Sequence, residues 1–149
     1  MSERYLIIAG KFNDMITRSL VSGAEQTLLE HKVAPDCIEI VWVPGCFEIP
    51  VTAAKAARSQ RFGAIICLGA VIRGETPHFD YVASQAASGL MNVSIATEIP
   101  VVFGILTTDT VEQALNRAGL KHGNKGVDAA RTAVEMVTLF NNVNWSKKA

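Results

Sequence analysis

Six residues near the middle of the chain, RGETPH (73–78), combine features of a turn that binds anions and transfers protons. They follow an apolar run typical of a strand and precede a segment typical of a helix. Thr76 suits the N-cap of that helix and Pro77 its first position, which places His78 in the first turn. Free backbone N–H groups there, with Gly74 permitting close approach, would bind phosphate or another oxyanion.

His78 has two interpretations. The positive end of a helix disfavours an imidazolium ion, so we expect His78 to be neutral near pH 7 and able to accept a proton. A surface histidine on an ordinary helix start would have the same sequence. The residues alone leave both interpretations open.

Two phenylalanines and one acid lie where a ligand would meet the turns. Phe12 follows the first strand, so its ring either faces a flat ligand or staples the first turn of the next helix. Phe103 lies within an apolar strand, and we expect it in the core unless it faces a subunit boundary. Glu48, in VPGCFEIP, either accepts hydroxyl hydrogen bonds from a ligand or complements a helix dipole.

Basic residues gather near the C-terminus. Arg117 and Lys121 flank Gly119, and Lys125 follows shortly after. A helix C-terminus accommodates cations for structural reasons alone, so this cluster does not by itself indicate a ligand.

Several functional classes find no support in the sequence. Fourteen basic residues balance fourteen acidic ones without a basic stripe, which argues against nucleic acid or an anionic membrane as a partner. The histidines 31, 78 and 122 have no metal-ligand spacing, so no metal is expected. GxSxG, P-loop and GxGxxG motifs are absent. Three cysteines lack CxxC spacing, and no apolar run suits a secretory signal or a membrane span, so we expect a cytoplasmic protein.

Strand-like and helix-like segments alternate along the chain. Strands are predicted over 5–10, 37–43, 63–72 and 100–108, and helices over 13–32, 50–59, 77–97, 110–119 and 127–142, with Asn13 or Asp14 capping the first. This order predicts a single α/β domain over 1–149, with a three-layer α/β/α arrangement and a four-stranded parallel, flavodoxin-like sheet. Ligands bind such sheets at the carboxyl ends of the strands. GKFND, VPGCFEIP, GAVIRGETPH and GILTTDT all fall there.

Five segments together resemble the 6,7-dimethyl-8-ribityllumazine synthase family. In order, from about residue 6 to about 136, they are KFND, WVPGCFEIP, LGAVIRGETPHFDYV, PVVFGILTT and EQALNRAGLKHGNKG. The resemblance implies a transferase that condenses 5-amino-6-ribitylaminouracil with 3,4-dihydroxy-2-butanone 4-phosphate and releases phosphate and water. This is the penultimate step of riboflavin biosynthesis, and it needs no cofactor and no metal.

The resemblance also implies roles for individual residues. Phe12 would stack on the pyrimidine, and Glu48 with Asn13 would lie near the ribityl chain. Backbone groups around Cys46, Phe47, Val71 and Ile72 would form hydrogen bonds with the polar edge of the pyrimidine. Cys46 stands where Ser or Ala is commoner in the family.

The phosphate would be held by backbone N–H groups of Gly74, Glu75 and Thr76, with Arg117 as its charged partner, and His78 would transfer protons. We expect the Glu75 side chain to point away from the phosphate. Phe103, Lys121 and Lys125 would approach the bound substrates from the opposite side of the site. Phe103 and the region 117–125 would come from a neighbouring subunit.

The resemblance implies a homopentamer with active sites between subunits. An icosahedral shell of pentamers is the larger alternative, and riboflavin synthase is a further partner to consider. Two other classes remain as competing hypotheses. A flavin-binding electron-transfer module would need a Ser/Thr/Gly-rich phosphate loop after the first strand, which GKFND is not. A non-catalytic shell protein would not need Phe12, Glu48, His78 and Arg117 together.

Overall fold

The computed structural model describes residues 3–121 and 123–146, which contain a four-stranded parallel sheet. The strands are β1 (Tyr5–Gly10), β2 (Ile38–Val43), β3 (Ala64–Ile72) and β4 (Val101–Thr108). Their order is β2-β1-β3-β4, so β2 and β4 form the edges. The predicted four-stranded parallel sheet is therefore confirmed.

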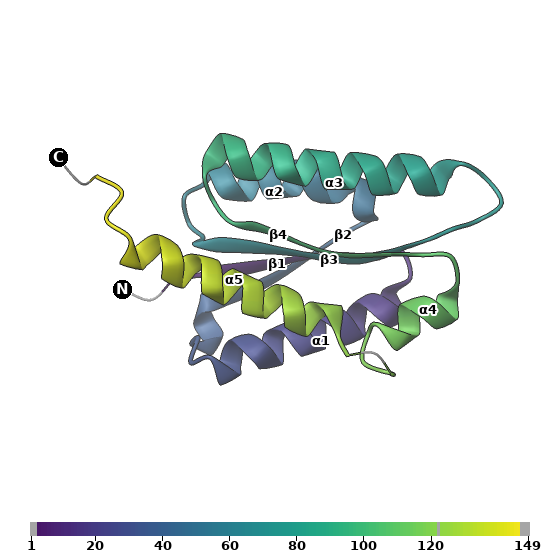
Figure 1. The fold of residues 1–149 in the computed structure, drawn as a ribbon, viewed down its shortest axis with the longest axis horizontal. Helices are drawn as coiled ribbons and strands as arrows, with labels where there is room; N and C mark the ends of the chain where they lie inside the picture. The colour runs from purple at the N-terminus through teal and green to yellow at the C-terminus, as the bar shows by residue number, and fades with distance from the viewer. Residues whose placement is uncertain (1–2, 122, 147–149) are drawn as a thin grey trace.

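Helices cover both faces of the sheet and complete the predicted three layers (Figure 1). They are α1 (Asp14–Glu30), α2 (Ile49–Arg58), α3 (His78–Thr97), α4 (Val111–Asn116) and α5 (Lys125–Asn142), with short 3₁₀ helices at Pro35–Cys37 and Cys46–Glu48. Helices α1, α4 and α5 lie on one face, and α2 and α3 lie on the other. None of these helices, within the described ranges, is both long and apolar enough to cross a membrane.

The central strands are apolar throughout because each face of the sheet has its own core. In β1, Tyr5, Ile7 and Ala9 pack with the α1 and α5 side, whereas Leu6 and Ile8 pack with the α2 and α3 side. Strands buried on both faces do not alternate between apolar and polar residues. The sheet is thus packed on both faces, and it positions the turns at the carboxyl ends of its strands.

The pairing of α1 with α5 depends on a capping residue and a glycine. The Asn124 side chain accepts hydrogen bonds from the backbone N–H groups of Gly126 and Val127, and it donates to the carbonyl of Ser19 in α1 at 3.0 Å. Helix α5 consequently begins at Lys125, two residues before the predicted start at 127. Lys125 therefore lies in a helical first turn rather than in a loop.

We predict that Gly126→Ala destabilises the fold by about 3 kcal/mol, because an added Cβ would overlap the backbone carbonyl of Leu20. Alanine is better than glycine in a helix by only about 1 kcal/mol, so the clash dominates. Urea unfolding of both proteins measures the difference. Gly74→Ala is the matched control, since no heavy atom lies within 4 Å of its added Cβ. Equal loss in both variants would contradict the prediction.

Candidate active site

Three turns meet at the carboxyl ends of β1, β2 and β3. Together with the start of α3 they enclose a hollow of about 320 Å³, which we call the Phe12–His78 hollow. It is lined by Phe12, Asn13, Cys46, Ala70, Val71, Ile72, Gly74, Thr76, His78, Phe79 and Val82. Eight predicted site residues thus lie in one place, although they come from segments far apart in the sequence.

The Phe12 ring is available to a ligand. Its side chain is 71% exposed, so it is not stapled against the first turn of α1. The Phe12 backbone N–H donates to the carbonyl of Pro44 at 3.2 Å, which ties its turn to the one after β2. An added Cβ on Gly45 would lie 2.9 Å from Cδ2 of Phe12, so the ring rests directly over that glycine. Such an exposed, positioned ring suits stacking on a planar heterocycle.

Asn13 connects two of the turns. It occupies the N-cap position of α1 in a left-handed conformation (φ 59°) and makes no side-chain cap, so the predicted capping role of its side chain is wrong. The amide instead donates to the carbonyl of Ala70 at 3.1 Å. Asparagine tolerates the left-handed region better than most residues. Asn13 therefore holds the Phe12 turn against the end of β3.

Glu48 and Phe47 lie in the same turn but are not part of the lining of the hollow. The Glu48 carboxylate curls back toward Gly45, where an added Cβ would be 3.4 Å from its Oε1. Glu48 occupies the N-cap position of α2 but makes no side-chain cap. Its carboxylate is therefore near the Phe12 ring, where a ligand hydroxyl would reach it.

Cys46 closes the bottom of the hollow. Its thiol fills the space over Gly69, where an added Cβ would lie only 2.5 Å from the sulfur. Burial raises the pKa of this thiol to about 12; the Glu48 charge acts in the same direction, and a backbone hydrogen bond from Ala70 opposes them. Burial also raises the pKa of Cys67 behind it in β3. Cys46 is thus a protonated, inert thiol at neutral pH and not a nucleophile.

Helix α3 starts one residue later than predicted. Pro77 occupies its N-cap position without a side-chain cap, and His78 is its first helical residue, so the predicted capping role of Thr76 is wrong. Gly74 has open space where its Cβ would be, so no protein neighbour requires a glycine there. Residues 73–78 are exposed, and Gly74, Thr76 and His78 among them line the hollow. A helix start of this kind attracts anions.

Phe103, Arg117 and Lys125 lie together on a different part of the chain. Phe103, on edge strand β4, is 37% exposed, so of its two expected positions the core is excluded and the subunit boundary stays a prediction: β4 pairs only with β3 and leaves its outer side open. We call the adjoining space of about 360 Å³ the Phe103–Arg117 hollow. Its lining comprises Phe103, Ile105, Leu106, Thr107, Arg117, Lys125 and Asp128. It has no lining residue in common with the Phe12–His78 hollow.

Lys121 and Glu75 line neither hollow, and both are exposed. Asp128 lines the second one but was missed by the sequence reasoning. It lies one turn after Lys125 on α5, a spacing that marks neighbours on one helix face. Because the predicted helix began at 127, Lys125 lay outside it, and the sequence did not indicate that Lys125 and Asp128 share a helix face.

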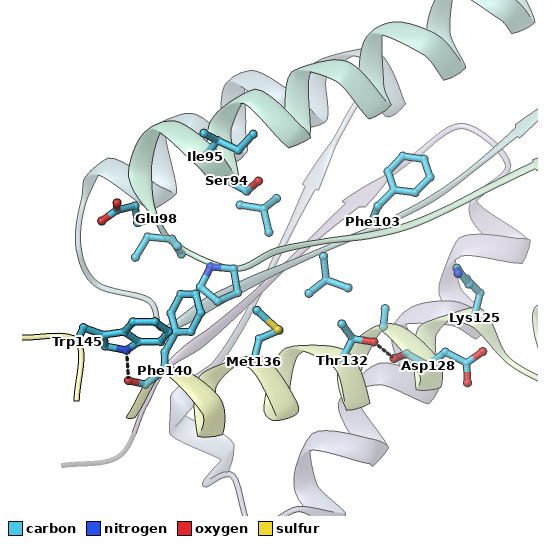
Figure 2. Close-up of a pocket in the computed structure, with 15 residues that line it drawn as sticks. Ser94, Ile95, Glu98, Phe103, Lys125, Asp128, Thr132, Met136, Phe140 and Trp145 are labelled. Atoms are coloured by element: carbon cyan, nitrogen blue, oxygen red, sulfur yellow. Dashed lines mark hydrogen bonds between the residues drawn. The ribbon is translucent and has the colours of Figure 1, made fainter. Parts of the chain in front are cut away.

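A larger groove of about 860 Å³ runs along the outer side of β4, between α3 and α5 (Figure 2). Apolar side chains such as Ile95, Met136 and Phe140 line it. Near the C-terminus, Trp145 meets Phe140 edge to face at 5.7 Å between ring centroids and donates from Nε1 to the Phe140 carbonyl. The groove shares Phe103, Lys125 and Asp128 with the Phe103–Arg117 hollow.

No cluster of three or more His, Cys, Asp or Glu side chains that would hold a metal ion occurs in residues 3–121 and 123–146. His122 lies outside the described residues.

The buried thiols give a pH-dependent prediction. Because the folded-state pKa of Cys46 lies above its unfolded value, its contribution to stability is complete below about pH 9 and is lost as the pH rises toward 12. Relative to Cys46→Ser, which does not ionise in this range, the wild type should lose about 2 kcal/mol between pH 9 and 11. Urea unfolding at each pH measures this, and parallel curves would contradict it.

The chain is similar to a solved structure and to a family model. A solved structure, the GDP-L-fucose synthetase from Naegleria fowleri bound to NADP, aligns with a TM-score of 0.47 and 10% identity over 95% of this chain, which spans only 45% of that one. The family model described as 6,7-dimethyl-8-ribityllumazine synthase matches residues 2–141, nearly the whole sequence. With the parallel sheet and the clustered turns, that match shows that the chain belongs to the 6,7-dimethyl-8-ribityllumazine synthase family.

Proposed function

We propose that this chain condenses 5-amino-6-ribitylaminouracil with 3,4-dihydroxy-2-butanone 4-phosphate to 6,7-dimethyl-8-ribityllumazine, the penultimate step of riboflavin biosynthesis. Membership of the family supports a lumazine-forming enzyme of that pathway. The observation that carries the finer assignment is the Phe12–His78 hollow, which combines an exposed ring, a helix start and a histidine.

The pyrimidine would stack on Phe12 at the mouth of this hollow. Backbone groups of the Cys46 and Phe47 turn and of Val71 and Ile72 would pair with its polar edge. Backbone groups suit this role because the sheet and the 3₁₀ helix fix them in place. Glu48, beside the ring, would accept hydrogen bonds from the ribityl hydroxyls.

The ketone phosphate would lie at the start of α3. Gly74, Glu75 and Thr76 are exposed there and make no hydrogen bond within the described residues, so their backbone N–H groups would be available, and the helix dipole favours negative charge. Their neighbour His78 would be within reach of the reacting carbons. Arg117 and Lys121 would supply the positive charges that bind the phosphate. Lys125 would approach the bound pyrimidine.

The chemistry needs no nucleophile from the protein. The substrate amine attacks the ketone carbonyl, water leaves to form an imine, and phosphate and further water are lost as the second ring closes. Each step moves protons, and His78 would accept and return them. Holding both substrates together supplies most of the acceleration, and His78 adds roughly 10²-fold. The protonated Cys46 thiol stays out of the reaction.

We further propose that each active site is completed by a second copy, within a homopentamer. The Phe12–His78 and Phe103–Arg117 hollows are separate on one chain, although the proposed substrates need residues of both. The groove along β4 is continuous with the second hollow and leaves apolar side chains open. Exposed apolar side chains elsewhere, including Met15, Val51, Tyr81 and Met91, are typical of surfaces buried between subunits.

For the reaction, we predict lumazine fluorescence and phosphate release from the two substrates, both faster than in the uncatalysed mixture. His78→Ala should lower kcat by about 100-fold, because the proton acceptor is lost. Its affinity for the pyrimidine should hardly change, since the ring of Phe12 and the backbone groups remain.

The matched control is His31→Ala, which removes a histidine at the far end of α1, where its Nδ1 contacts the Thr27 carbonyl. This variant should keep wild-type turnover. A wild type without acceleration would refute the enzyme, and purified yellow protein with bound flavin would favour the electron-transfer hypothesis. A large loss of pyrimidine binding in His78→Ala would contradict the proton-transfer role.

For the shared site, Arg117→Ala should raise the KM of the phosphorylated ketone by at least about 10-fold, because a charged hydrogen bond to phosphate is lost. Co-expressed in equal amounts and assayed with the ketone well below its wild-type KM, the His78→Ala and Arg117→Ala chains should regain about a quarter of wild-type activity, since a quarter of the interfaces in a mixed ring pair two intact halves. Tagged co-purification verifies mixing. Activity no higher than the mean of the separate variants, or an active monomer in sedimentation, would overturn the shared site.

A further inference from the structure

Arg73 is the first residue after β3, and it joins three separate segments. Its Nε donates to Oδ1 of Asp109 at 2.8 Å, in the turn after β4. Its Nη2 lies 3.8 Å from Oδ1 of Asp80, in the first turn of α3. The guanidinium carbon lies 4.4 Å from the ring centroid of Phe79, and the Arg73 backbone N–H donates to the Thr108 carbonyl at 2.9 Å.

The turn that follows Arg73 has little else to hold it. Among the hydrogen bonds of the described residues, none involves Gly74, Glu75 or Thr76. Helix α3 starts at His78 with no side-chain cap. The position of the first turn of α3 therefore depends on contacts of its next residues, Phe79 and Asp80, and Arg73 meets both.

Charge argues against a direct role for Arg73 in holding phosphate. Two carboxylates flank the guanidinium, so an incoming dianion would compete with both of them. The planar fork instead matches a carboxylate on one side and a ring face on the other, a combination that lysine does not reproduce.

The contacts of Arg73 lead directly to the proposed active site. Phe79 packs against the core beneath α2 and α3, and it lines the Phe12–His78 hollow beside His78. On the other side, the Asp109 backbone N–H donates to Oε1 of Gln113, within the capping box of α4. Asp109 precedes α4 and Arg117 follows it, and both residues line the same small hollow. Arg73 thus connects the turn before His78 to the capped start of α4.

We propose that Arg73 is a positioning residue for His78, holding the first turn of α3 by its ion pairs with Asp109 and Asp80 and its stacking on Phe79. The proposal rests on the proposed function for its catalytic consequence. Arg73 acts through His78 and does not touch either substrate.

The test compares Arg73→Ala and Arg73→Lys with Arg61→Ala in the full-length protein. Arg61 is the matched control because it also pairs with a carboxylate, that of Glu39, and lies over a ring, that of Phe62, but it precedes β3 at the opposite end of the sheet. Exposed ion pairs contribute little to global stability, so all three variants should fold. Thermal unfolding verifies this.

Two readouts decide the proposal. Amide hydrogen exchange over residues 80–82, whose N–H groups are hydrogen-bonded, should become about 10-fold faster in Arg73→Ala and remain unchanged in Arg61→Ala. Turnover of Arg73→Ala should fall about 10-fold, with the KM of the pyrimidine within about 2-fold of the wild type and Arg73→Lys in between. In a His78→Ala background, Arg73→Ala should lower kcat by less than about 2-fold, because a displaced helix start no longer matters.

Unchanged exchange over 80–82 would show that Arg73 does not hold the turn. An undiminished effect of Arg73→Ala in the His78→Ala background would show that it does not act through His78. Either result overturns the proposal while the wild-type reaction stands. A wild type that fails to accelerate the condensation refutes the proposed function itself, and the catalytic consequence falls with it, whereas the exchange data still decide whether Arg73 anchors α3.

Discussion

Parallel pairing of all four strands is the constraint on which the candidate site depends. Because every strand runs in the same direction, each chain reversal must cross over a face of the sheet through a helix, and all carboxyl ends gather at one edge. The turns after β1, β2 and β3 therefore meet without any long loop. Backbone bonds from Lys11 and Phe12 to the turn after β2, and the Asn13 amide on Ala70, then hold these turns together.

The same topology leaves the fourth strand incomplete. Strand β4 has a neighbour on one side only, so Phe103 and the groove beside it stay open, and the cations of α4 and α5 project near this edge rather than into the Phe12–His78 hollow. One chain thus presents two separate hollows on different surfaces, which in the proposed reaction would be two parts of one site. A closed ring of copies, each placing its β4 side against the next copy's hollow, is the simplest way to join them.

Much of this could be predicted because apolar runs and turn residues are local signals. The order of strands and helices along the chain and the gathering of turns at the carboxyl ends of the strands both followed from periodicity and parallel pairing. The misses share a different cause, since they depend on tertiary neighbours. Phe103 lies in an apolar run but on an edge strand, and Asn13 turns its amide to β3 instead of capping α1. The start of α5 at Lys125 depends on Asn124 reaching α1, and only then do Lys125 and Asp128 share a helix face.

Arg73 shows why charge in a sequence does not by itself indicate a ligand. It is the cation nearest the proposed phosphate turn along the chain, yet Asp109 and Asp80 occupy its guanidinium. The positive charge that a phosphate dianion requires must therefore come from elsewhere, and Arg117 lies in the other hollow. The lining of the Phe12–His78 hollow contains no lysine or arginine, and the dipole of a helix start binds anions weakly in water. In the proposed reaction, binding of the phosphorylated substrate, and with it catalysis, would then depend on assembly, because the charged partner would come from the neighbouring copy.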